Sequence, residues 1–238
     1  MEPSCDVVSI NDITNAYYIN LEHRIDRKVH VERELDKLGI RATRFNAIQM
    51  KNGAIGCSLS HLRILEEAKK NNMGHVLILE DDIMFLDSDL FKSQLNKFFN
   101  LHGHNWDVIL FAGNNIPPYE VIDDTCVKVS RCQTTTGYLV NGHYIDVLAS
   151  NVKRGITFLL NKPDEKSSYA IDKYWFELQK ADRWFLITPL TVVQKEGYSD
   201  IEQKETNYTK LMQDLDKREL FNAIKEMRNK QSISSKKI

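Results

Sequence analysis

Short apolar runs separated by longer periodic segments predict alternating strands and helices in the first half of the chain. The runs that predict strands are 16–20, 41–48, 76–79 and 106–114. The run 76–79 is apolar throughout, which is typical of a strand buried on both faces of a sheet that helices cover. This alternation favours a single α/β domain with a mostly parallel central sheet flanked by helices.

Apolar residues three and four positions apart predict the helices between these strands. In the helix predicted over 26–38, the residues expected on the buried face are Ile25, Val29, Glu32, Leu35 and Leu38. Gly39 follows this helix and is placed to end it in a left-handed turn. Further helices are predicted over 57–71, 88–100, 143–152 and 172–180.

The second half of the chain is less regular and favours short strands. Strands are predicted over 137–141 and 184–194, and Pro189 interrupts the second of them. The predicted organisation is an N-terminal extension (1–15), one main domain (16–203), a polar C-terminal helix (204–230) and a disordered tail (231–238).

Composition and charge exclude several classes of protein. The chain has 238 residues, of which 42% are hydrophobic, enough for a sizeable core. Its net charge of −1 does not indicate a nucleic-acid binder. No apolar run approaches the roughly 20 residues of a transmembrane helix, and the first 15 residues do not resemble a signal peptide. We therefore expect a cytoplasmic protein without a transmembrane segment. Cys126 and Cys132 could pair, but a reducing compartment favours free thiols.

Three adjacent carboxylates, Glu80, Asp81 and Asp82, directly follow the run that is apolar throughout. Two unit charges 4 Å apart repel by about 4 kcal/mol at an effective dielectric of about 20. A divalent cation would remove this repulsion, and oxygen ligands suit Mn²⁺ or Mg²⁺. In an extended chain Glu80 and Asp82 point to one side and Asp81 to the other. The alternative is a solvated acidic turn that caps the next helix, although Asp87 or Asp89 could equally supply that cap.

With these residues in view, the chain resembles glycosyltransferase family 25, which includes bacterial lipooligosaccharide galactosyltransferases and collagen β-galactosyltransferases. The resemblance rests on ordered motifs: YYINLEHRIDR (17–27), GCSLSH (56–61), VLILEDD (76–82), WDVILFAGN (106–114), TGYLVN (136–141), AID (170–172) and PLTVVQ (189–194). It implies a GT-A-like, Rossmann-like fold and transfer of galactose or glucose from a UDP-sugar, with inversion, to a hydroxyl acceptor on a glycan or protein. It also implies Mn²⁺ or Mg²⁺, with Glu80 and Asp82 as metal ligands.

The residues expected to bind the donor are Asn20, Leu21, Arg24, Arg27, Ser60, His61, Asp81, Gly137, Tyr138 and Gln194. Guanidinium groups suit phosphate oxygens, so Arg24 and Arg27 are candidates for the diphosphate. Alternatively, these arginines pair with neighbouring acidic side chains. His61 is equally consistent with packing in the interior. For Tyr138, core packing is the favoured interpretation.

Inverting transfer needs a general base for the acceptor hydroxyl. Asp172, at the start of a predicted helix, is the first candidate, and Glu177 and Asp164 are reserves. Alternatively, Asp172 only stabilises the helix terminus. Two other functions stay open: a non-catalytic binding module with the same fold, and metal-dependent phosphoryl transfer.

Overall fold

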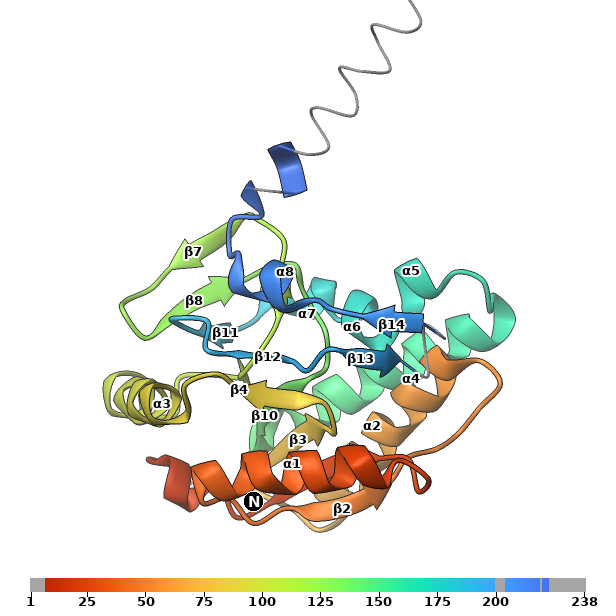
Figure 1. Cartoon of the computed structure of the whole chain (residues 1–238), viewed down its shortest axis with the longest axis horizontal. Coiled ribbons are helices and arrows are strands. Elements are labelled where there is room, and N and C mark those ends of the chain that lie inside the picture. Colours follow the sequence, from red (N-terminus) through yellow and green to blue (C-terminus); the bar gives the residue numbers. More distant parts are fainter. Residues whose placement is uncertain (1–6, 200–203, 219, 223–238) are drawn as a thin grey trace, which may run out of the picture.

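The computed structural model describes residues 7–199, 204–218 and 220–222. Its centre is an eight-stranded sheet (Figure 1). In spatial order the strands are β2 (Thr43–Asn46), β1 (Ala16–Asn20), β3 (His75–Glu80), β10 (Gly137–Asn141), β5 (Val108–Leu110), β11 (Trp184–Ile187), β8 (Cys126–Val129) and β7 (Tyr119–Val121).

Six of these eight strands run in the same direction. β2, β1 and β3 are parallel to one another, and β11 is parallel to β5. β10 is antiparallel to both β3 and β5, which therefore share a direction. β8 is antiparallel to β11 and β7, so only β10 and β8 are reversed. The prediction of an α/β fold with a mostly parallel sheet is confirmed.

Helices cover both faces of the sheet. On one face, α1 (Ile25–Leu38) and α3 (Ser88–His102) pack against alternate residues of the strands, such as Leu77 and Leu79. On the other, α2 (Gly53–Lys70) and α4 (Ile145–Asn161) pack against Val76 and Ile78. The alternation along β3 explains its unbroken apolar sequence, because both faces of this strand are buried.

The buried face of α1 differs from the predicted one. Leu35 and Leu38 are buried as expected, but Ile25 is 67% exposed and Val29 is also exposed. The buried positions are Val31, Glu34, Leu35 and Leu38. Glu34 tolerates burial because its carboxylate accepts a hydrogen bond from the backbone N–H of Phe85 (2.8 Å) and pairs with Lys37 (2.6 Å). Gly39 adopts φ 72°, which confirms the left-handed end of the helix.

Several predicted elements are shorter or divided in the structure. The helix predicted over 172–180 is two short helices, α6 (Ile171–Tyr174) and α7 (Phe176–Ala181), which follow α5 (Lys166–Tyr169). The strand predicted over 184–194 is divided at Pro189 into β11 and β12 (Val192–Gln194). The small two-stranded pairs are β12 with β4 (Ile83–Phe85), β13 (Gly197–Ser199) with β14 (Lys204–Thr206), and β6 (Asn114–Asn115) with β9 (Cys132–Gln133).

The predicted terminal segments also differ. The 3-10 helix η1 (Ile10–Asp12) lies in the expected N-terminal extension, yet Val7, Ile10 and Ile13 are buried in the core beneath α1 and α3. The C-terminal helix was expected from residue 204, but β14 occupies that position and α8 spans Thr209–Gln213. The Asn207 side chain accepts a hydrogen bond from the backbone N–H of Thr209, the first residue of this helix (3.0 Å). The predicted tail, 231–238, lies outside the described residues.

Two further expectations concern membranes and thiols. Among the described residues, no helix combines the length and apolar character needed to cross a bilayer. Cys57, Cys126 and Cys132 are free thiols, so the expected absence of a Cys126–Cys132 disulfide is confirmed.

A buried carboxylate connects β5, β11 and the 3-10 helix η2 (Gly142–Tyr144). Asp107 accepts hydrogen bonds from the backbone and side chain of Arg183 and lies 2.7 Å from His143 Nε2. Burial raises the pKa of Asp107, but the bonds from Arg183 and His143 outweigh it, and the net pKa is lowered. The charged form of Asp107 therefore stabilises the fold.

We expect Asp107→Asn to lower the free energy of unfolding by about 1.5–3 kcal/mol at pH 7, the range for hydrogen bonds to a charged group. Because the pKa of Asp107 is lower in the folded protein, its contribution is complete above the unfolded pKa of about 3.9 and is lost as pH falls through the folded value. Urea denaturation at several pH values measures this.

The matched control is Asp146→Asn, because Asp146 forms an exposed ion pair with Lys69. This change should alter stability by less than about 1 kcal/mol. An advantage of the wild type over Asp107→Asn that is as large at pH 3 as at pH 7 would contradict the electrostatic role of Asp107.

Candidate active site

A cavity of about 520 Å³ lies beyond the carboxyl ends of β1, β2 and β3. The residues that line it are Ile19, Leu21, Arg27, Ala47, Ile48, Gln49, Met50, Lys51, Gly53, Cys57, Ser60, Glu80, Asp81, Asp82, Gln194, Tyr198 and Ser199. The three strands share a direction, so their ends meet at one edge of the sheet, where α/β proteins bind ligands. The acidic triplet follows β3 into this cavity.

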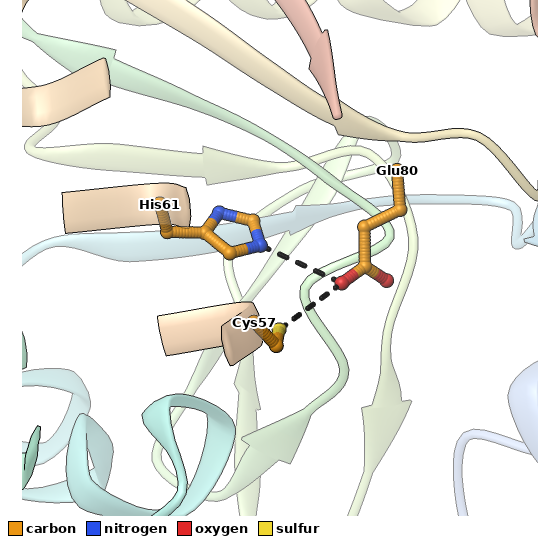
Figure 2. Close-up of side chains that lie close together, drawn as sticks. All are labelled: Cys57, His61 and Glu80. Carbon is orange, nitrogen blue, oxygen red and sulfur yellow. Dashed lines mark hydrogen bonds and ion pairs between the residues drawn. The ribbon is translucent and has the colours of Figure 1, made fainter. Parts of the chain in front are cut away.

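Glu80, the last residue of β3, is held on the α2 side of the sheet. Its Oε1 accepts a hydrogen bond from Thr135 Oγ1 (2.8 Å) and lies 3.5 Å from His61 Nε2 and 3.6 Å from Cys57 Sγ. Figure 2 shows Cys57 and His61 directed at this one oxygen. Cys57 and His61 are one helical turn apart on α2, which brings both to the same carboxylate. Burial raises the pKa of Glu80, but the His61 and Thr135 contacts outweigh it, so the pKa is lowered.

His61 and Tyr138 lie behind Glu80 rather than on the cavity wall. Both are fully buried, and His61 Nδ1 is 2.8 Å from the Tyr138 hydroxyl. If Tyr138 donates to Nδ1, then Nε2 carries the proton that points at Glu80. Trp175 packs edge-on against Tyr138. The structure therefore places these two predicted donor-binding residues where they orient a carboxylate.

Asp81 points to the α1 side and is fully paired. Its Oδ2 accepts a hydrogen bond from Asn20 Nδ2 (2.7 Å), and its Oδ1 lies 3.0 Å from Arg27 Nη1. Asn20 is itself fixed by Arg44, whose Nε donates to Asn20 Oδ1 (2.9 Å). Burial raises the pKa of Asp81, and the charge of Arg27 and the bond from Asn20 offset only part of the rise.

Asp82 is the least satisfied carboxylate of the triplet. Its Oδ2 shares Arg27 Nη1 at 3.3 Å, but its Oδ1 is buried and has no hydrogen-bond partner among the described residues. Burial and then the charge of Glu80 raise the pKa of Asp82 to about 7. The pairing of β4 with β12 sets Gln194 opposite Ile83, so Gln194 enters the same cavity.

The remaining predicted donor-binding residues divide into two groups. Leu21 and Ser60 line the cavity. Ser60 also holds the loop after β2, because its Oγ accepts from Ile48 N (2.9 Å). Arg24 and Gly137 are absent from the lining. Arg24 makes two 3.0 Å bonds to Asp26, which matches the alternative considered for it, and it has further contacts.

Gly137 has a packing reason of its own. A Cβ added there would meet Ile83 Cδ1 at 2.7 Å and Leu79 Cδ2 at 3.0 Å. Leu79 and Ile83 lie directly before and after the acidic triplet in sequence. The absence of a side chain at Gly137 therefore lets β10 approach the end of β3 closely.

Asp172 lies beside the cavity but does not line it. Its Oδ2 accepts a hydrogen bond from Thr134 N (3.2 Å) and lies 3.6 Å from Lys173 Nζ. Its charge acts on the Cys57 thiol and helps raise the pKa of that thiol, after burial and Glu80. The reserve candidates Glu177 and Asp164 are exposed, and Glu177 pairs with Lys180.

The sequence did not single out part of the cavity wall. The loop 47–51 follows β2 and therefore reaches the same sheet edge as the triplet. Finding this loop from the sequence would have required the order of the strands in the sheet. Thr135 was also missed. It precedes β10, and only the antiparallel pairing of β10 with β3 brings it to Glu80. Tyr198 reaches the wall because its backbone oxygen accepts from Arg27 (2.9 Å).

The donor set fits a hard divalent cation. Glu80 and Asp82 both line one cavity with carboxylate oxygens. Asp82 Oδ1 is a buried acceptor that has no hydrogen-bond partner among the described residues. Oxygen donors of this kind suit Mn²⁺ or Mg²⁺.

Comparison with known proteins agrees with this geometry. Residues 49–157, which include the triplet, match the family described as glycosyltransferase family 25 (LPS biosynthesis protein). A glycosyltransferase 25 family member of Anopheles gambiae is 31% identical over 170 residues, covering 54% of this chain and 27% of that protein. The matches are thus to the glycosyltransferase class, and residues 49–157 are similar to family 25.

The similarity to known proteins covers only part of the longer relatives. The chain spans about a quarter of the length of the first curated relatives it matches. An inactive glycosyltransferase 25 family member 3 of Mus musculus is 29% identical over 76 residues, covering 31% of this chain and 12% of that protein. A solved glycosyltransferase involved in glycosylation of the major capsid of PBCV-1 is 12% identical, with a TM-score of 0.43, over 84% of this chain and 88% of that one.

We expect Asp82→Asn to raise the free energy of unfolding by about 1–3 kcal/mol at pH 8 in the presence of EDTA. The amide has a similar shape but carries no charge to be buried beside Glu80, and this range is the usual penalty of an unsatisfied buried group. Urea denaturation measures the change.

Asp81→Asn is the matched control, because Asp81 is the adjacent carboxylate but is paired with both Asn20 and Arg27. These partners offset part of the burial cost of its charge, so Asp81→Asn should stabilise the protein less than Asp82→Asn under the same conditions. If Asp82→Asn stabilises the metal-free protein no more than Asp81→Asn does, Asp82 is not the less satisfied carboxylate.

Proposed function

We propose that the chain is a metal-dependent, inverting glycosyltransferase with a GT-A-like domain that moves galactose or glucose from a UDP-sugar to a hydroxyl acceptor on a glycan or protein. One observation carries the proposal: a buried carboxylate oxygen of Asp82 has no partner among the described residues, in a cavity that it shares with Glu80. The similarity of residues 49–157 to glycosyltransferase family 25 supports the reaction class.

Glu80 and Asp82 would hold Mn²⁺ or Mg²⁺, which would neutralise negative charge on the diphosphate leaving group. The protein's part is to keep the two carboxylates in place before the metal arrives. Thr135 and His61 fix Glu80, and Arg27 fixes one oxygen of Asp82. Such prior orientation limits the conformational entropy lost on binding.

The donor would occupy the cavity between the end of β1 and the loop after β2. A volume of about 520 Å³ is within the usual range for small-molecule sites. Leu21 and Ile48 offer apolar surface for the uracil and ribose, and Arg27 and Lys51 are cationic groups on the wall. Asp81, through its bonds to Asn20 and Arg27, positions this side of the cavity.

In the proposed transfer, the acceptor oxygen attacks the anomeric carbon as the bond from that carbon to the β-phosphate oxygen breaks. UDP leaves with the electron pair, and the acceptor proton passes to a base. We propose Asp172 as this base. It is partly buried, acts electrostatically on Cys57 at the cavity wall, and has one carboxylate oxygen, Oδ1, outside the bond to Thr134. Glu177 and Asp164, by contrast, face solvent.

A non-catalytic binding module is the second candidate, favoured by the match to the mouse protein named as inactive. This chain has all three carboxylates in one cavity, which supports catalysis instead. Such a module would bind no nucleotide, or would bind it without transfer.

Asp82→Ala should abolish metal-dependent binding of UDP-galactose and UDP-glucose, because it removes a metal ligand. Isothermal titration calorimetry with and without Mn²⁺ measures this. Asp89→Ala is the matched control, since Asp89 is a strongly exposed carboxylate seven residues further on, and it should leave binding unchanged. Equal donor affinity for the wild type and Asp82→Ala would contradict the proposed role of Asp82 as a metal ligand.

Asp172→Asn should leave donor affinity nearly unchanged and lower turnover by about 10²–10⁴-fold, the usual contribution of a general base. Release of UDP in the presence of acceptor measures turnover, and calorimetry measures donor binding. Glu177→Gln is the control and should remain active. If donor binding is lost in folded Asp172→Asn, Asp172 is a donor ligand rather than the base.

A further inference from the structure

A second cluster of metal-ligating side chains lies away from the cavity, between the end of α3 and the β7–β8 hairpin. His102 Nε2 is 2.8 Å from Asp123 Oδ2 and 3.8 Å from Cys126 Sγ, and the three ligand atoms all lie within 4.8 Å of one another. None of these residues lines the proposed active site. An imidazole nitrogen, a carboxylate oxygen and a sulfur therefore converge on one point.

The surroundings fix each of the three ligands. The ring of His102 packs against Phe98 (4.5 Å between centroids) and Phe185 (5.8 Å). Asp123 Oδ1 accepts bonds from Thr125 N (2.7 Å) and Oγ1 (2.6 Å), which leaves Oδ2 to face His102. Supporting contacts of this kind orient ligands in metal sites and raise their affinity.

Two of the three residues in the cluster are partly exposed to solvent. The side chains of His102 and Asp123 are 15% and 26% exposed, whereas Cys126 is fully buried. His102 is also the last residue of α3, a 15-residue helix whose carboxyl end favours a cation. The nearby Lys97 is paired with Asp124, so its charge is compensated.

We propose that His102, Asp123 and Cys126 form a zinc site that joins α3 to the β7–β8 hairpin, with water as the fourth ligand. Nitrogen and sulfur donors suit the borderline-soft Zn²⁺, whereas Mn²⁺ and Mg²⁺ prefer oxygen. The zinc site and the proposed active site would therefore select different metals. Binding replaces the His102–Asp123 hydrogen bond by bonds to the metal, and the Cys126 thiol releases its proton to solvent.

The simpler interpretation is a hydrogen bond that holds the hairpin to α3. Gln94 already connects these elements, since its Nε2 donates to the backbone oxygens of Asp124 and Thr188. A hydrogen bond alone needs only His102 and Asp123. A zinc site also needs the Cys126 sulfur, so the thiol distinguishes the two.

The test titrates Zn²⁺ and Co²⁺ into the full chain, kept reduced and stripped of metal. We expect one equivalent of Zn²⁺ to bind with a rise in the melting temperature, and Co²⁺ to show a thiolate-to-cobalt absorption band. In Cys126→Ser, His102→Gln and Asp123→Asn, zinc affinity should fall at least about tenfold. Circular dichroism in EDTA checks that each variant folds.

Cys57→Ser is the matched control, because Cys57, His61 and Glu80 form the other such cluster among the described residues. It should keep both the zinc affinity and the cobalt band. The proposal is overturned if the wild type binds no zinc, if folded Cys126→Ser binds it as tightly, or if only Cys57→Ser loses it. If Cys126→Ser does not fold, zinc binding by folded His102→Gln or Asp123→Asn that is as tight as in the wild type overturns the proposal instead.

Discussion

The structure around the cavity depends on one constraint: a strand buried on both faces ends in three consecutive carboxylates. Each must leave water, and each repels the others. The fold answers by sending them to different partners. Glu80 meets α2 and the segment before β10, Asp81 meets β1 and α1, and Asp82 shares Arg27 with Asp81 and lies beside the Gln194 side chain. Both oxygens of Asp81 therefore have partners, whereas Asp82 Oδ1 has none among the described residues.

This division explains why residues far apart in sequence have linked roles. The partner of Asp81 is Asn20 at the end of β1, and that of Glu80 is His61 on α2, which Tyr138 on β10 supports. Parallel strand order brings the ends of β1 and β3 together, and antiparallel β10 brings its first residues to the same edge. The charge distribution at the cavity is thus a consequence of the sheet topology.

Local patterns predicted the elements well and their tertiary partners poorly. The limits of β1 and β10, and the left-handed end of α1 at Gly39, agree with the structure. The buried face of α1 was misjudged because Glu34, a charged residue, is buried through a bond to the backbone of Phe85. Thr135 and the loop 47–51 could not be found, because their place at the cavity follows from strand order, which periodicity does not encode.

Under the proposed function, the unequal pairing of Asp81 and Asp82 sacrifices stability for metal binding. A second cation beside Arg27 would have satisfied the Oδ1 of Asp82 permanently, as Asn20 and Arg27 satisfy Asp81. It would also have occupied the position that Asp82, as the proposed metal ligand, must keep available. Incomplete satisfaction of a buried group is destabilising, and it persists where the surrounding fold can bear it and the site requires it. The well-packed sheet beneath the triplet, with Leu77, Ile78 and Leu79 fully buried, supplies that support.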